Sequence, residues 1–208
     1  MTWKNDQVSE EETQKILKLA KKCLEVPGDY VEFGCYKGDT SLLLAELLVE
    51  NSVEKSVENA CKKSGNVVEK SECGNSRKRL WIYDSFEGLP DKNKADESVL
   101  GVDFKEGELF VTKREVKERF LRAGLPVPVI KKAWFADLKD EDLPERIAFA
   151  FLDGDFYESI RDSLRLVGSR MNHNGIIVVH DYTNPALPGV RKAVDEWDGV
   201  QGVELVLL

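Results

Sequence analysis

Acidic residues stand directly after the apolar segments of this 208-residue chain that have the character of strands. Ligands of open parallel sheets bind beyond the carboxyl ends of the strands, so we expect these side chains to line one site. Helix caps and turns account for one or two acidic residues at strand ends, but poorly for a series of five strands. The polar residues in these positions are Glu32, Asp84, Asp137, Asp153, Asp155, His180 and Asp181.

The stretch VEFGCYKGDTS, residues 31–41, joins the first of these segments to a helix. A dinucleotide-binding turn normally reads GxGxxG, and its helix N-terminus faces a pyrophosphate. Here Glu32 takes the place of the first glycine, and its carboxylate would repel a pyrophosphate. The same carboxylate suits a ligand with an ammonium group beside its own carboxylate, as in S-adenosylmethionine. We expect Gly34 and Gly38 to allow close approach, and the N–H groups near Gly38 and Thr40 to face the ligand carboxylate.

Three further positions are predicted to bind the nucleoside part of this ligand. Asp84, at the end of the second strand, is placed to accept hydrogen bonds from ribose hydroxyls. Phe86 is expected to flank the nucleoside, and Asp137 to accept from the adenine amino group. Trp134 and Phe135 are candidates for the wall beside the ring, with burial as ordinary core aromatics as the alternative.

Alternating strand and helix patterns predict an α/β fold with a mostly parallel central sheet and helices on both faces. A surface insertion is expected over residues 50–78, rich in Lys, Glu, Ser and Asn, within a single domain over 1–208. Strands are expected at 30–33, 79–86, 127–135, 146–155, 172–182 (after a turn) and 203–208, and helices at 9–26, 40–50, 111–125, 157–171 and 189–197.

Composition narrows the classes of partner. The net charge of −8 and the lack of a basic cluster argue against nucleic acid. No apolar run reaches the ~20 residues of a membrane span, and the N-terminus is too polar for a signal peptide. Four cysteines without CxxC spacing indicate reduced thiols, so we expect a cytoplasmic protein. We expect its partner to be a small-molecule acceptor. The sequence does not decide whether the protein forms a homo-oligomer.

Several blocks of the chain together resemble the macrocin O-methyltransferase family. These are VEFGCYKGDTSLLLAELL, LWIYDSFEGLP, AWFADLKDEDLP, FLDGDFYESIRDSL and GIIVVHDYTNPALPGVRKAVDEW. The resemblance implies a Rossmann-like class I methyltransferase fold, S-adenosyl-L-methionine as donor and a divalent metal, usually Mg²⁺. It also implies metal binding and proton removal by Asp153, Asp155 and Asp181. The residues assigned to the cofactor are Glu32, Gly34, Tyr36, Gly38, Thr40, Ser41, Asp84, Ser85, Phe86, Asp137 and Asp153.

The chain departs from the family pattern in two places. His180 stands where the family commonly has a second carboxylate, and imidazole is a softer ligand than Mg²⁺ prefers. After Trp197 only one strand pattern remains, where this class of sheet usually ends in an antiparallel hairpin. We therefore expect an incomplete sheet edge, from a missing strand or a shortened chain.

The predicted reaction is transfer of a methyl group to a hydroxyl of a small molecule or sugar moiety. Asp153 and Asp181 would hold the metal, and Asp155 or His180 would take the proton. The bland alternatives are a helix cap for Asp155 and a hydrogen-bonded strand-end histidine for His180. At the level of function, the alternatives are a non-catalytic S-adenosylmethionine-binding protein and a nicotinamide enzyme. The absence of GxGxxG counts against the nicotinamide enzyme.

Overall fold

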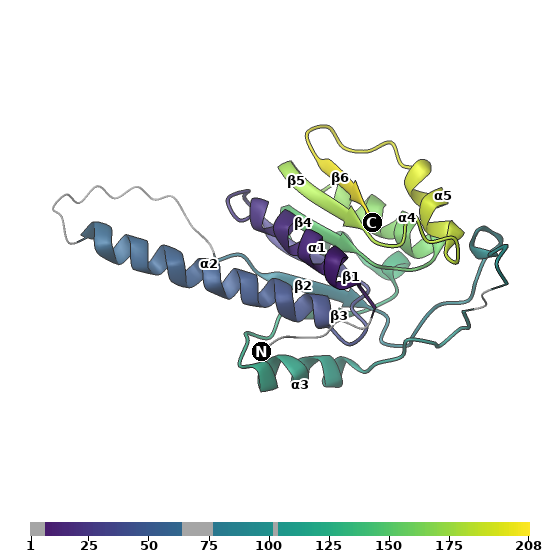
Figure 1. The fold of residues 1–208 in the computed structure, drawn as a ribbon, viewed down its shortest axis with the longest axis horizontal. Coiled ribbons are helices and arrows are strands. Elements are labelled where there is room, and N and C mark those ends of the chain that lie inside the picture. The colour runs from purple at the N-terminus through teal and green to yellow at the C-terminus, as the bar shows by residue number, and fades with distance from the viewer. Residues whose placement is uncertain (1–6, 64–76, 102–103) are drawn as a thin grey trace.

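A six-stranded sheet, all of whose strand pairs are parallel, forms the centre of the protein (Figure 1). The computed structural model describes residues 7–63, 77–101 and 104–208, and the side chains of all these except 54–63. The strand order is β3-β2-β1-β4-β5-β6. Strands β2 and β3 therefore lie on one side of β1, and β4, β5 and β6 lie on the other, so the strand order reverses between β1 and β4. The predicted α/β fold is confirmed. The strands are β1 Asp29–Phe33, β2 Leu80–Asp84, β3 Val129–Lys132, β4 Ile147–Leu152, β5 Met171–Val179 and β6 Glu204–Leu207.

Helices cover both faces of this sheet, as right-handed crossovers require. On one face α1, α2 and α3 contribute to a buried cluster that includes Ile16, Leu44 and Phe120. On the other face α4 and α5 contribute to a second cluster that includes Ile160 and Val190. The helices are α1 Glu10–Lys22, α2 Asp39–Lys63, α3 Lys113–Ala123, α4 Tyr157–Gly168 and α5 Pro188–Asp195, with short 3₁₀ turns η1 Lys94–Asp96, η2 Phe135–Asp137 and η3 Asp140–Asp142.

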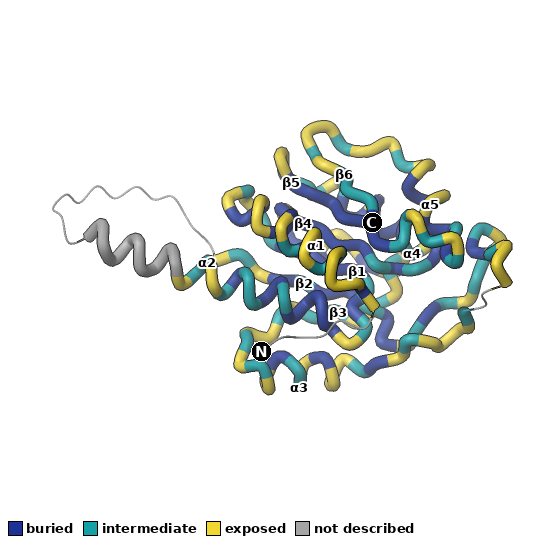
Figure 2. Tube along the Cα trace, viewed as in Figure 1, coloured by how far each residue is buried: buried dark blue, intermediate teal, exposed yellow. Residues whose placement is uncertain are grey.

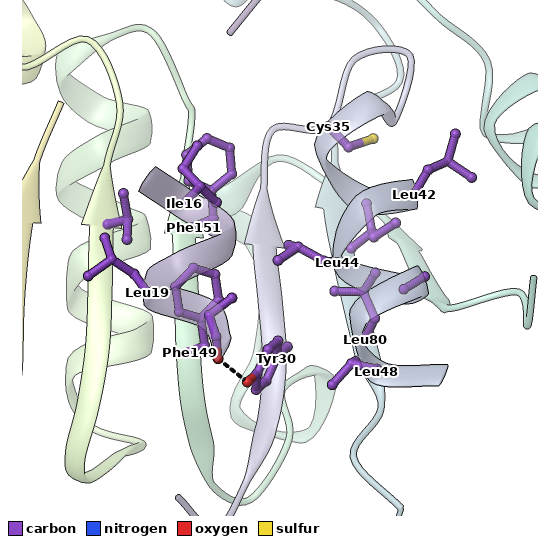
Figure 3. Packing of buried hydrophobic residues seen from close by; sticks show 14 of the residues in the cluster. Ile16, Leu19, Tyr30, Cys35, Leu42, Leu44, Leu48, Leu80, Phe149 and Phe151 are labelled. Carbon is purple, nitrogen blue, oxygen red and sulfur yellow. Dashed lines mark hydrogen bonds between the residues drawn. The ribbon is translucent and has the colours of Figure 1, made fainter. Parts of the chain in front are cut away.

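The central strands β1 and β4 contribute many of the buried residues of the core. Every residue of β4 is buried, which matches its continuous apolar sequence, and the exposed positions lie mainly on the helices and loops around it (Figure 2). Tyr30 on β1 packs against Phe149 on β4, with ring centroids 5.3 Å apart. Its hydroxyl donates to the carbonyl of Ala20 at 2.5 Å, which ties β1 to the end of α1 (Figure 3).

Helix α2 is longer than the sequence pattern indicates. The prediction ended this helix near residue 50 and was wrong, because the helix continues to Lys63 and projects past the sheet (Figure 1). The chain has no glycine or proline between Asp39 and Gly65, and its Glu, Lys and Ala residues are good helix formers. Residues 64–76 of the expected insertion lie outside the described residues.

Helices α1 and α3 each begin with a capping box. Ser9 and Glu12 form the first, at α1. Thr112 and Glu115 form the second, at α3, with the same reciprocal hydrogen bonds. In each box the glutamate accepts from the N-cap backbone and hydroxyl, and the hydroxyl accepts from the glutamate N–H.

The far edge of the sheet is formed by β6, which runs parallel to β5. No antiparallel strand pair occurs in the described ranges, so the terminal hairpin that the sequence analysis expected to be incomplete is not seen there. In the same part of the chain, no helix is long and apolar enough to cross a bilayer. Cys23 and Cys35 are buried thiols without a disulfide, as predicted; the side chains of Cys61 and Cys73 lie outside the described residues.

The packing predicts a large cost for truncating Phe149. Phe149→Ala removes a fully buried ring between β1 and α1, so the free energy of unfolding should fall by ~3–5 kcal/mol. Chemical denaturation followed by circular dichroism measures this loss. Phe110→Ala, at a side chain that is 59% exposed, is the matched control and should cost under ~1 kcal/mol. Equal losses for the two variants would contradict the assignment of the core.

Candidate active site

A cleft of about 880 Å³, open to solvent, lies at the carboxyl ends of the strands. The cleft spans the point between β1 and β4 where the strand order reverses, which is where open α/β sheets bind ligands. Predicted site residues that line it are Glu32, Gly34, Tyr36, Thr40, Asp84, Ser85, Asp153, Asp155, His180 and Asp181.

Gly34 brings the ends of β1 and β4 together. Its φ is +82°, and an added Cβ would lie 1.9 Å from the carbonyl oxygen of Asp153. A side chain is therefore excluded by both the backbone conformation and the neighbouring strand. The requirement for glycine here comes from strand packing, and it places Glu32 close to Asp153.

Asp84 holds the turn that follows β1. Its Oδ2 accepts from the backbone N–H of Cys35 at 2.9 Å and of Tyr36 at 3.3 Å, and its Oδ1 accepts from Phe86 N–H at 2.7 Å. The carboxylate still lines the cleft, but these bonds already use part of its accepting capacity. The sequence predicted the position of Asp84 and missed its bonds to this turn.

Glu32 is a carboxyl group buried at the floor of the cleft, with 1% of its surface exposed. Burial raises the pKa of Glu32 well above its usual value, and the charges of Asp153 and Asp84 raise it further. The Ser41 hydroxyl donates to Glu32 Oε2 and offsets only part of this rise in pKa. A positive partner would therefore stabilise an ionised Glu32, and the neutral Ser41 hydroxyl is not one.

His180 joins two carboxylates at the ends of β4 and β5. Its Nδ1 lies 3.0 Å from Asp153 Oδ1 and 2.9 Å from Asp181 Oδ2. Burial alone would lower the pKa of His180, but the charges of these two carboxylates and the hydrogen bonds to them raise it to about 11. The ring is therefore a cation at neutral pH, and so it is a poor acceptor for a substrate proton.

Asp155 has the properties of a proton acceptor. Burial, together with the charges of Asp153 and Asp181, raises the pKa of Asp155 well above its usual value. Its φ of +60° is uncommon for a residue with a side chain and occurs at functional sites. Asp155 does not cap α4, because the N-cap is Phe156 and the Tyr157 N–H donates to Asp96 at 2.7 Å instead. The helix-cap alternative for Asp155 is therefore not supported.

Four predicted cofactor residues do not line the cleft. Ser41 is buried behind Glu32, and Gly38 has a φ of +80° in the turn before α2, where an added Cβ would lie 3.3 Å from Val116 Cγ1. Phe86 is buried in the core with 3% exposure, whereas Asp137 is exposed on η2. Trp134 and Phe135, from the same turn as Asp137, do line the cleft.

Sequence patterns missed several residues of the cleft wall. Gln7 and Val8, before α1, form one side, and Leu89, Pro90 and Leu109 form another. These residues come from a chain end and a long loop, where no periodic pattern predicts which side chains face a ligand. Two signals were present: the DSFEGLP block contains Leu89 and Pro90, and the sequence made the loop over residues 90–109, which ends at Leu109, a candidate for the acceptor pocket.

The cluster also offers donors for a divalent ion. One ligand atom each of Asp153, His180 and Asp181 lies within 4.8 Å of the others, whereas Asp155, a predicted ligand, is outside this group of described residues. The two carboxylates fit the oxygen ligands that Mg²⁺ prefers, and Mg²⁺ usually keeps several waters beside one or two of them. The imidazole nitrogen does not match that preference. Asp153 and Asp181 therefore fit the ion, and His180 is the exception.

Solved methyltransferases share this fold. The O-methyltransferase NovP superposes with a TM-score of 0.70 at 24% identity, over 89% of this chain and 70% of NovP. Together with a cleft at the strand-order reversal, this likeness defines a class I methyltransferase fold. The model of the macrocin-O-methyltransferase family (TylF) matches residues 67–207, well over half of the chain. The protein belongs to this family.

Curated relatives extend the similarity through the first strand and its turn. A tetracenomycin-C rhamnosyl 4'-O-methyltransferase from Streptomyces olivaceus is 28% identical over 183 residues, which cover 86% of this chain and 60% of the relative. Demethyldecarbamoylnovobiocin O-methyltransferase from Streptomyces niveus is 26% identical over 194 residues, covering 88% of this chain and 65% of the relative. The chain thus spans 60–65% of the length of these two relatives.

The raised pKa of Glu32 predicts a pH-dependent stability difference. Below its unfolded-state pKa of about 4.5, Glu32 is protonated in both the folded and the unfolded protein, so its ionisation does not change the free energy of unfolding. As the pH rises toward its higher folded-state pKa, the unfolded chain loses a proton that the folded protein retains, so stability falls. The glutamine in Glu32→Gln has a similar shape but does not ionise, so this variant does not lose stability in this way as the pH rises.

The melting temperature of Glu32→Gln minus that of the parent should therefore increase between pH 5 and pH 8, as measured by differential scanning calorimetry. The exposed Glu145→Gln provides the matched control for removal of one carboxylate. A difference for Glu32→Gln that stays constant or shrinks with rising pH would contradict the burial argument.

Proposed function

We propose that this protein is an S-adenosyl-L-methionine-dependent O-methyltransferase that acts on a hydroxyl of a small molecule or sugar moiety. The observation that carries this proposal is the buried carboxyl of Glu32 at the floor of a cleft at the carboxyl ends of the strands. Family membership supports it, as do relatives whose names describe O-methylation of a rhamnosyl-bearing and a novobiocin-type compound. We further propose that residues 1–208 act as one methyltransferase domain.

The cofactor is oriented by the turn after β1 and by the N-terminus of α2. Glu32 receives the amino group, directly or through water, and gains the positive partner that its burial demands. Asp39 and Thr40 bring the positive end of α2 to the cleft, where it suits the cofactor carboxylate. Asp84 and Ser85 are placed for the ribose.

The adenine lies against the turn between β3 and β4. Trp134 and Phe135 both line the cleft there, and Phe135 also packs edge-on against Phe33 of β1, with ring centroids 5.1 Å apart. Phe135 is thereby held in position by the core while it faces the ligand. Asp137, exposed one turn away, reaches the adenine amino group only from outside this wall.

Asp155 accepts the proton of the acceptor hydroxyl. A carboxylate whose pKa is raised above its usual value is a stronger base than an ordinary aspartate. His180 carries a proton already, so between the two predicted candidates the structure favours Asp155 as the base. Asp153 and Asp181 would hold a divalent ion, which when bound would favour the deprotonated form of the acceptor oxygen.

Substitution of Asp155 tests this assignment. Asp155→Asn keeps the shape of the side chain and removes the base, so kcat should fall by ~10²–10⁴-fold while the affinity for S-adenosylmethionine changes little. Methyl transfer to a panel of sugar-bearing acceptors, followed by mass spectrometry, measures kcat, and calorimetry measures binding. The exposed Asp198→Asn serves as the control and should retain full activity.

Unchanged turnover in Asp155→Asn would rule out this residue as the base. A parent protein that binds S-adenosylmethionine but transfers no methyl group to any acceptor would favour the second candidate, a non-catalytic binding protein. The presence of His180 in place of a family carboxylate is the observation that favours that candidate.

A further inference from the structure

The N-terminal helix approaches the catalytic cluster through one side chain. Glu12 Oε1, in the first turn of α1, lies 3.8 Å from His180 Nε2. His180 is only 7% exposed at its side chain, and Glu12 is 34% exposed. The two residues are 168 positions apart in sequence, and the first turn of α1 meets the end of β5 through this ion pair.

Each oxygen of Glu12 has its own contact. Oε2 accepts from the Ser9 backbone N–H at 3.1 Å and from the Ser9 hydroxyl at 2.5 Å, which completes the capping box of α1. Oε1 faces His180. The hydrogen bonds from Ser9 fix the carboxylate in place, so its second oxygen is presented to the ring without further loss of side-chain freedom.

Both nitrogens of His180 therefore face carboxylates. Nδ1 contacts Asp153 and Asp181, and Nε2 points to Glu12. A carboxylate at one ring nitrogen determines which way an imidazole points its other nitrogen, as in the carboxylate–histidine pairs that orient metal ligands.

We infer that Glu12 is a positioning residue of the active site, which holds His180 Nε2 so that Nδ1 is directed at Asp153 and Asp181. Gln7 and Val8, just before α1, line the cleft, so the chain over residues 7–12 contributes both to the wall of the cleft and to the orientation of the cluster. The consequence for turnover rests on the proposed function, whereas the consequence for the ring orientation does not.

The second capping box offers a matched control. Glu115 makes the same bonds to Thr112, at 2.8 Å from the backbone N–H and 2.6 Å from the hydroxyl, but lies exposed at the start of α3. Glutamine serves in capping boxes, so Glu12→Gln and Glu115→Gln both preserve a cap. Glutamine has only one oxygen and no charge, so at position 12 it cannot both complete the cap and present a carboxylate oxygen to His180.

Imidazole NMR of the full chain tests the contact. The chain has two histidines, and exposed His173 provides an internal reference. At pH 7, Glu12→Gln should shift the ring ¹⁵N signals of His180 and leave those of His173 in place, whereas Glu115→Gln should shift neither. Ser9→Ala weakens the cap but keeps the Glu12 carboxylate, so it should change the His180 signals less than Glu12→Gln does.

Kinetics then measure the effect on the proposed reaction. Glu12→Gln should lower kcat roughly 10- to 100-fold with the KM for S-adenosylmethionine unchanged, and Glu115→Gln should lower neither. His180 signals in Glu12→Gln that match those of the parent would overturn the inference, as would equal kcat losses in the two glutamine variants. A parent without methyl transfer would instead overturn the proposed function, and the NMR result would still decide the position of His180.

Discussion

The burial of a carboxyl group at the carboxyl end of β1 is the constraint on which the site depends. Taking an ionised Glu32 out of water costs several kcal/mol unless a positive group compensates it. Asp153 and Asp84 stand nearby and make the charge on Glu32 still less favourable, and one hydroxyl from Ser41 is a small compensation. The cleft is therefore built so that a cationic ligand relieves an electrostatic cost that the folded chain bears alone.

The scaffold around this carboxyl is assembled from backbone contacts between strands that are distant in sequence. Gly34 lets the end of β1 touch the Asp153 carbonyl, and Asp84 binds the N–H groups of the turn that follows. On the other side of the cleft, the positively charged ring of His180 lies between the carboxylates of Asp153 and Asp181 and contacts both. The two sides of the cleft differ: a buried imidazole joins the carboxylates of Asp153 and Asp181, whereas the buried carboxyl of Glu32 is bonded to the neutral hydroxyl of Ser41.

Much of this arrangement could be predicted from the sequence. Continuous apolar runs such as that of β4 identify buried parallel strands, and the acidic residues after them mark the edge where ligands bind. The length of α2 was missed because the polar composition after residue 50 resembles a loop, although nothing in it stops a helix. The positions of Asp137 and Phe86 off the cleft depend on the path of short turns, which periodicity does not determine.

Contacts between distant residues are the part that sequence patterns could not predict. The pairing of Glu12 with His180, or of Asp96 with the start of α4, follows only once the helices have packed on the sheet. Likewise, the protonated state of His180 depends on the two carboxylates at its Nδ1 and not on its own type. The sequence identified His180 as unusual, and the structure is needed to favour Asp155 over it as the base.

The central claim is that Glu32 pairs with a cationic amine, and one calorimetric comparison tests it most directly. Titration of S-adenosylmethionine into the parent and Glu32→Gln should show binding that the substitution weakens roughly 10- to 100-fold, as loss of a charged hydrogen bond predicts. Equal affinities for the two proteins, or a parent that takes up a pyrophosphate-bearing dinucleotide and not S-adenosylmethionine, would contradict the account.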